Sequence, residues 1–137
     1  MLSKPHKWGY KFFVLSGVSG FVYNFVIYTG QKNDPKFRRN DEPDLGAAAN
    51  VVVRLSRTIP NNCNYKLYFD NYYTFLDLLI HLAKRGIYSH GTIRRNRVPQ
   101  NKMPTEAEMK KLGRMAFEEM VCHVDGVDIS LVQWQDT

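Results

Sequence analysis

The chain has 137 residues and a mass of 16.0 kDa, which is room for one domain. With 44% hydrophobic and 13% aromatic residues, its composition excludes a disordered chain and is typical of a packed core. A net charge of +6 favours a polyanionic partner, with nucleic acid ahead of a membrane surface, although a soluble basic domain would also fit. We expect no signal peptide and no membrane-spanning helix, because no apolar run approaches about 18 residues.

The thiol and imidazole side chains are scattered along the sequence. Cys63 and Cys122 lie far apart and neither belongs to a C-x-x-C pair, which indicates a reducing compartment without a disulfide framework. The histidines do not have the spacing of a zinc finger: His6, His81, His90 and His123. We therefore predict no zinc site.

The chain opens with a predicted hairpin. Residues 8–16 and 21–29 are rich in aromatic and β-branched residues, as strands are. The Ser- and Gly-rich residues 16–20 between them predict an antiparallel turn. Residues 30–43 are polar and predict a mobile surface loop.

A helix is expected over residues 45–58, with the Asp44 side chain capping its first amides. Its buried stripe follows helical spacing: Leu45, Ala48, Ala49, Val52, Leu55 and Ile59. The break at Pro60 leads into residues 64–70, which predict a short buried strand.

A second helix is expected over residues 74–85. Thr74 is its predicted N-cap, and Gly86 suits the left-handed position after its last turn. The expected buried stripe is Leu76, Leu79, Ile80 and Ala83. Residues 87–93 then predict another strand.

The last third of the chain predicts a short helix and a second hairpin. A capping-box pattern starts the helix at about residue 104 and it ends near residue 112. Residues 117–124 and 127–134 form the hairpin, closed by Asp125-Gly126, a strong two-residue turn signal. The complete order predicts an α/β fold with a mixed sheet and helices packed on its faces.

Asp70 is the most informative single residue. It stands at the carboxyl end of the predicted strand 64–70, where open α/β sheets bind ligands, and its carboxylate suits Mg²⁺ or Mn²⁺. The alternative is that Asp70 caps the start of the following helix or turn, which is the commoner role of such an aspartate. Chemistry with two metal ions about 4 Å apart needs several carboxylates, so Asp70 would be one part of a site. The other aspartates lie in loops, a first helical turn or the last hairpin: Asp34, Asp41, Asp44, Asp77, Asp125, Asp128 and Asp136.

A basic run, T-I-R-R-N-R, occupies residues 92–97. Guanidinium groups suit phosphate contacts, and the Asn96 amide can bind a phosphate or a base edge. Further cations continue the run: Lys102, Lys110, Lys111 and Arg114. A solvated charged loop is the alternative interpretation.

Four tyrosines surround the Asp70 segment: Tyr65, Tyr68, Tyr72 and Tyr73. Their rings could stack on unpaired bases. Their spacing favours packing in the core instead.

Seven short motifs in order along the chain resemble those of piggyBac-type transposases and related transposable-element-derived proteins. They are K-P-H-K-W-G-Y-K (4–11), Y-T-G (28–30), L-G with V-V (45–52), F-D-N-Y-Y-T (69–74), G-T-I-R-R-N-R (91–97), L-G-R (112–114) and W-Q-D (134–136). Two positions depart from the family pattern, because Phe75 replaces a frequent Ser and Met115 replaces a usual Gly.

This resemblance implies a ribonuclease-H-like sheet and a DDE mechanism, in which three aspartates hold two Mg²⁺ or Mn²⁺ ions while DNA is cut and joined. Asp70 is similar to the second aspartate. The family's first aspartate lies upstream of the K-P-x-K motif and its third lies downstream of W-x-D, so Asp136 does not match the third. We expect residues 1–97 to be a partial core and residues 98–137 the start of an inserted segment.

The resemblance also implies DNA as the partner, nuclear localisation, and a homodimer in a full-length parent. Arg94, Arg95, Asn96, Arg97 and Lys102 are the expected DNA contacts. Alone, the chain is expected to be inactive and poorly stable, because the family's opening strand would lie between strands 8–16 and 64–70 and leave their edges unpaired. The alternative function is a domesticated, non-catalytic nucleic-acid-binding module.

Overall fold

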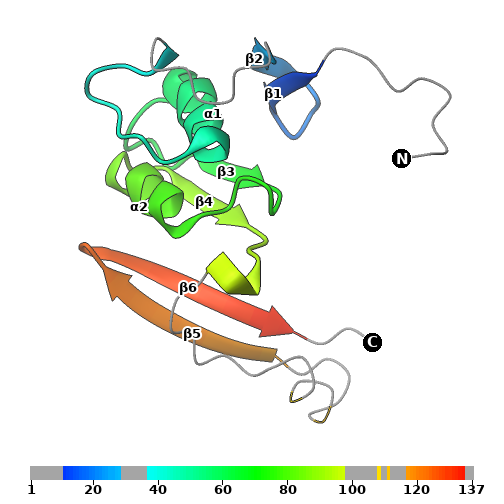
Figure 1. Cartoon of the computed structure of the whole chain (residues 1–137), viewed down its shortest axis with the longest axis vertical. Coiled ribbons are helices and arrows are strands. Elements are labelled where there is room, and N and C mark those ends of the chain that lie inside the picture. The colour runs from blue at the N-terminus through cyan, green and yellow to red at the C-terminus, as the bar shows by residue number, and fades with distance from the viewer. Residues whose placement is uncertain (1–10, 29–36, 98–107, 109–110, 112–116, 135–137) are drawn as a thin grey trace, which may run out of the picture.

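The computed structural model describes residues 11–28, 37–97, 108, 111 and 117–134. This part of the chain has a mixed α/β architecture of two α-helices and three two-stranded sheets (Figure 1). The strands are β1 (Phe12–Ser16), β2 (Val22–Ile27), β3 (Lys66–Phe69), β4 (Tyr88–Gly91), β5 (Phe117–Val124) and β6 (Val127–Trp134). The helices are α1 (Ala47–Leu55) and α2 (Leu76–Lys84), with 3-10 turns at Ser56–Thr58 and Arg95–Arg97. None of the described helices is long and apolar enough to span a membrane.

The first hairpin is confirmed over its described residues. β1 and β2 pair antiparallel, with Phe13 opposite Val26 and a bulge after Leu15. The Phe13 side chain is buried, whereas the opposite face of the hairpin is exposed. That exposed face is largely apolar: Phe12, Val14, Phe25 and Ile27. Residues 8–10 and 29 of the predicted strands lie outside the described residues.

The strand–helix–strand unit in the middle of the chain is also confirmed. β3 and β4 pair in parallel, from Lys66 opposite Tyr88 to Phe69 opposite Gly91, and α2 lies between them in sequence. The prediction of a buried strand is wrong for most of β3, because only Leu67 is buried. The helices cover one face of this pair, so Tyr68 on the other face stays exposed.

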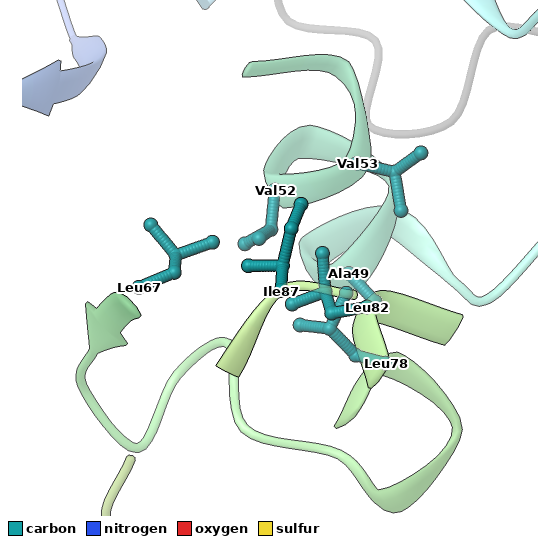
Figure 2. Close-up of a cluster of buried hydrophobic side chains, with 7 residues drawn as sticks. All are labelled: Ala49, Val52, Val53, Leu67, Leu78, Leu82 and Ile87. Carbon is teal, nitrogen blue, oxygen red and sulfur yellow. The ribbon is translucent and has the colours of Figure 1, made fainter. Parts of the chain in front are cut away.

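The core lies between the two helices and this parallel pair. Figure 2 shows its seven side chains, contributed by α1, by α2, by β3 and by the residue before β4. They are Ala49, Val52, Val53, Leu67, Leu78, Leu82 and Ile87. Each large aliphatic side chain buried here contributes about 1.5–3 kcal/mol to folding.

Two predicted helix caps are wrong. The Asp44 carboxylate accepts the Gly46 N–H at 3.2 Å, ahead of the helix, and α1 begins with Gly46 as its N-cap. The Thr74 hydroxyl turns back to the carbonyl oxygen of Asp70 at 2.8 Å, and Phe75 is the N-cap of α2. Thr74 therefore stabilises the preceding loop, whereas Asp44, which also accepts the side-chain N–H of Asn50 at 2.9 Å, ties its loop to α1.

The end of α2 is tied to the chain that follows α1. The Arg85 guanidinium donates to the Asn61 side chain and the Ile59 carbonyl at 2.8 Å, and to the hydroxyl of the buried Ser56 at 3.1 Å. Burial lowers the pKa of Arg85 from its ordinary value. Gly86 follows with φ of +73°, which confirms the left-handed position predicted for it.

The second hairpin has the predicted boundaries. Asp125 and Gly126 both have positive φ, 51° and 80°, as a two-residue turn of this kind requires. β6 lies beside α2 and β5 lies outside β6 (Figure 1). One continuous sheet is not formed, because the described strands pair only two by two. Most of the predicted helix 104–112 lies outside the described residues.

Candidate functional site

The site begins at Asp70, directly after β3. Its Oδ1 atom accepts the N–H of Tyr72 at 3.0 Å, and its carbonyl oxygen accepts the N–H of Tyr73 at 3.2 Å. This is the capping role of the alternative interpretation. Within the part of the chain that is described, Oδ2 has no hydrogen-bond partner, and the residue is exposed. The carboxylate can therefore cap the turn with one oxygen and bind a ligand with the other.

Arg97 holds the loop that follows Asp70. Its Nη1 donates to the carbonyl oxygen of Asn71 and, at 3.3 Å, to that of Thr74. Its guanidinium group lies 4.2 Å from the centre of the Phe75 ring, close enough for a cation–π contact. The last residue of the basic run thus points toward the Asp70 loop.

The other members of the basic run are placed differently. Arg94 and Asn96 are exposed, and the Arg94 side chain makes no hydrogen bond or ion pair with another described residue, although its carbonyl oxygen accepts the Arg97 N–H at 3.0 Å. The Arg95 side chain reaches Gln133 on β6 at 3.3 Å. Lys111 is exposed, while Lys102, Lys110 and Arg114 lie outside the described residues.

Sequence reasoning missed Lys11, which lies on the other side of the loop. Its Nζ is 5.2 Å from the Phe13 ring centre, 5.8 Å from that of Tyr28 and 5.4 Å from that of Tyr72. The ammonium group therefore links the first hairpin to the residue whose N–H binds Asp70. Residues two apart in a strand lie on one face, so the sequence could have indicated that Lys11 lies beside Phe13. It could not have indicated the contact with Tyr72, because Tyr72 is distant in sequence.

The prediction that the tyrosines pack in the core is wrong for three of the four. Tyr68 is exposed because the helices cover only one face of β3, and Tyr65 before the strand and Tyr72 in the turn after it are exposed as well. Tyr73 is half-buried and packs edge-on against Phe13, with the ring centres 6.3 Å apart. Burial, then the nearby charge of Asp70, raise the pKa of Tyr73.

The remaining described aspartates do not converge on Asp70. Asp44 pairs with Arg38 at 3.3 Å, and Asp128 pairs with His123 at 2.7 Å. Asp77 is exposed in the first turn of α2. No group of three or more potential metal ligands occurs among the described residues. Asp70 fits the chemistry of one hard oxygen ligand, and a site for two ions needs further carboxylates.

The whole chain, residues 1–137, matches a family model described as Transposase IS4. The chain belongs to the IS4 transposase family. It is 25% identical over 135 residues to human PiggyBac transposable element-derived protein 3, and 26% identical over 137 residues to human PiggyBac transposable element-derived protein 2. It is also 25% identical over 135 residues to the human Chimeric ERCC6-PGBD3 protein.

These matches confirm the piggyBac-like resemblance of this IS4-family chain. They cover 97%, 98% and 97% of the chain but 21%, 22% and 12% of the three relatives, respectively. The chain thus spans about a fifth of the two derived proteins. No solved structure matches the chain significantly.

Two of the motifs that carry the family resemblance contact each other in this IS4-family chain. Arg97 from G-T-I-R-R-N-R holds the loop of F-D-N-Y-Y-T, as described above. Gly91, from the same motif as Arg97, lies close to Phe69 and Thr74. A Cβ atom at position 91 would be 2.4 Å from the Thr74 hydroxyl and 2.9 Å from the Phe69 carbonyl oxygen. Glycine at this position lets the end of β4 approach the Asp70 turn.

Proposed function

We propose that the chain is part of the catalytic domain of a piggyBac-like DDE transposase, which cuts and joins DNA with Mg²⁺ or Mn²⁺. The observation that carries this proposal is the family match over residues 1–137, together with an exposed carboxylate, Asp70, at the carboxyl end of β3. A ribonuclease-H-like sheet belongs to the proposal. So does the division into a partial core, residues 1–97, and an inserted segment beginning at residue 98.

In this proposal Asp70 supplies one of the three carboxylates of the DDE site. When bound, a divalent metal ion would stabilise negative charge on the reacting phosphate and help to form the nucleophile. The turn contributes orientation, because the Tyr72 N–H fixes Oδ1 and leaves Oδ2 exposed. The other two carboxylates come from outside residues 1–137, so the isolated chain does not cut or join DNA.

The proposed partner is DNA, which the basic run at residues 92–97, after β4, would contact. Arg94 and Asn96 are exposed and suit contacts to the phosphate backbone, and Arg95 and Lys102 belong to the same basic run in the sequence. Nuclear localisation and a homodimer of the full-length protein accompany this proposal. The endogenous protein that carries these peptides should then be several times heavier than 16.0 kDa.

Replacing Asp70 with Ala tests the catalytic assignment in the full-length protein. We expect metal-dependent DNA cleavage to fall by more than about a hundredfold, because removing even a group that only hydrogen-bonds to a metal ligand lowers activity by about 10- to 100-fold. DNA affinity should stay unchanged. Asp77→Ala is the matched control, since Asp77 is an exposed aspartate on α2 and lies outside the Asp70 turn. Cleavage retained by Asp70→Ala would refute the role.

A domesticated, non-catalytic nucleic-acid-binding module is the second candidate. It is favoured by the capping bond of Asp70, which gives this residue a structural role without any metal. In that case the full-length protein would bind DNA with a steep dependence on salt and would not nick it in Mg²⁺ or Mn²⁺. Asp70→Ala would then alter stability alone.

A further inference from the structure

Arg94 and Arg97, near the two ends of the basic run, differ in their contacts. Arg94 is exposed and its guanidinium group has no hydrogen-bonding or ion-pair partner among the described residues, whereas Arg97 is half-buried against the loop after β3. We propose that Arg97 is a positioning residue for Asp70 and not a phosphate ligand. The link to catalysis rests on the proposed function, but the positioning role itself does not.

The contacts of Arg97 close the Asp70 turn from outside. Within the turn, the Asp70 carbonyl oxygen accepts the N–H of Tyr73 and the Thr74 hydroxyl. The carbonyl oxygens of Asn71 and Thr74, one on each side of Tyr72 and Tyr73 in sequence, are both bound by Arg97 Nη1. A single guanidinium group thus satisfies two loop carbonyls and fixes their separation.

Stacking on Phe75 sets the plane of that guanidinium group. The Arg97 Cζ atom lies 4.2 Å from the centre of the Phe75 ring, at the residue that begins α2. A planar group held by a ring face and two carbonyls has little freedom to turn toward solvent. The loop between β3 and α2 is therefore anchored at its start, through Asn71, and at its end, through Phe75.

Asp70 is held through this loop. Its Oδ1 depends on the Tyr72 N–H, and Tyr72 follows the residue whose carbonyl Arg97 binds. If Arg97 releases Asn71, the Tyr72 N–H can rotate away and the carboxylate loses its fixed orientation. Positioned carboxylates are what metal-dependent phosphoryl transfer requires, since small displacements of a catalytic group lower the rate strongly.

Replacing Arg97 with lysine distinguishes a phosphate contact from a positioning role at this residue. A phosphate contact tolerates lysine, which binds phosphate as a point charge. The loop contacts do not, because lysine lacks the planar guanidinium group that lies over the Phe75 ring and donates to both carbonyl oxygens. Arg97→Lys therefore removes positioning and leaves the charge.

Hydrogen exchange of the full-length protein, measured without metal or DNA, tests the proposal directly. In Arg97→Lys, the amides of Tyr72 and Tyr73 should exchange about tenfold faster, as expected for the loss of a hydrogen bond to a charged group. The amides of Ile80 and Leu82 in α2 should exchange as in the parent protein. Arg94→Lys and Arg94→Ala are the matched controls and should leave the exchange of all four amides unchanged.

DNA binding and cleavage supply the second readout. Arg94→Ala should reduce the slope of log affinity against log salt by about one, the effect of losing one phosphate contact, whereas Arg97→Ala should leave this slope unchanged. Cleavage by Arg97→Lys should fall about tenfold or more in kcat while its affinity for DNA is retained.

Three results would overturn the proposal. The Tyr72 and Tyr73 amides of Arg97→Lys could exchange as in the parent protein. Arg97→Ala could lower the salt slope as Arg94→Ala does. Ile80 and Leu82 could lose protection equally, which would make Arg97 a support of the whole domain. Failure of the proposed function is distinguishable, because cleavage retained by Asp70→Ala would leave the exchange result intact.

Discussion

At the scale of single residues, Asp70 shows that two interpretations of one aspartate are compatible. A carboxylate has two oxygens, and here Oδ1 accepts the Tyr72 N–H while the exposed Oδ2 has no partner among the described residues. The sequence predicted both a cap and a ligand at this position. It could not predict the support of the turn by Arg97, because that contact joins residues 26 positions apart.

Gly91 is the residue at which a small change should have a large effect. In Gly91→Ala the new Cβ would lie 2.4 Å from the Thr74 hydroxyl and 2.9 Å from the Phe69 carbonyl oxygen, so backbone must move. We expect the free energy of unfolding to fall by about 1–3 kcal/mol, the usual cost of overpacking. Urea unfolding of the full-length protein measures it.

Ser89→Ala is the control for this substitution, because Ser89 lies on the same strand and keeps a Cβ. It should change stability by less than about 0.5 kcal/mol. Equal stability of Gly91→Ala and the parent protein would show that β4 can move away from the Asp70 turn without cost.

At the scale of elements, α1 and the 3-10 turn that follows it hold the segment in front of α1. The Arg57 guanidinium donates to both carboxylate oxygens of Glu42, at 2.8 Å to Oε2, and to the Phe37 carbonyl. Arg54 lies 4.3 Å from the centre of the Phe37 ring. The described part of the predicted loop 30–43 is therefore anchored on the helix.

This anchor predicts a loss of stability in acid. The hydrogen bond from Arg57 is the largest cause that lowers the pKa of Glu42 from 4.5 to about 2. A depressed carboxyl pKa stabilises the fold above the unfolded pKa, and this contribution disappears as the pH falls from about 4.5 to about 2. We expect a loss of about 1–3 kcal/mol across this window, allowing for partial solvent screening.

Urea unfolding at several pH values checks the acid prediction. Glu42→Gln cannot titrate, so it should be less stable at pH 7 and should lack the Glu42 part of the acid slope. Parallel pH profiles for the two proteins would contradict the prediction.

The helices also show where sequence patterns fail. α2 buries Leu78, Ile80 and Leu82, of which the sequence predicted only Ile80. Residues 75–80, F-L-D-L-L-I, are apolar at five of six positions, so several stripes fit the helical period equally well. Leu78 and Leu82 lie one turn apart and enter the core, whereas Ile80 lies on the other side of the helix, so packing of α2 against more than one element decided which residues are buried.

At the scale of the whole molecule, the described strands leave edges and faces uncovered. β1 pairs only with β2 and β3 only with β4, so each has an open edge among the described residues. The outer faces carry exposed Phe25, Tyr68 and Tyr88, which are 56%, 63% and 61% exposed. The helices contribute to one core, on one side. Unpaired strand edges and apolar faces of this kind favour aggregation.

The isolated 137-residue chain should therefore be poorly stable. We expect a broad thermal transition, concentration-dependent association, and binding of a dye that reports exposed apolar surface. Circular dichroism measures the thermal transition, light scattering the association and fluorescence the dye binding, with the full-length protein as the reference. A sharp cooperative transition from a monomer would show instead that the single core is sufficient.

The sequence by itself determined the features that depend on neighbouring residues. Asp125-Gly126 and Gly86 adopt the positive φ values that their turns need, and the strand and helix order follows the local hydrophobic pattern. The motif that contains Asp70 could also be recognised from the sequence, because its residues are contiguous.

Only the tertiary structure decided which side chains are buried and which way the polar ones point. Thr74 binds the Asp70 carbonyl oxygen and Asp44 binds Gly46 and Asn50, so neither caps a helix; Lys11 contacts Tyr72, and Arg97 turns inward while Arg94 stays exposed. The bonds of Thr74 and Asp44 are local, but the contacts of Lys11 and Arg97 depend on how separate elements pack, and no local pattern encodes that arrangement. The sequence shows which chemical groups each residue carries, whereas the packing of segments that are distant in sequence decides which groups those residues contact.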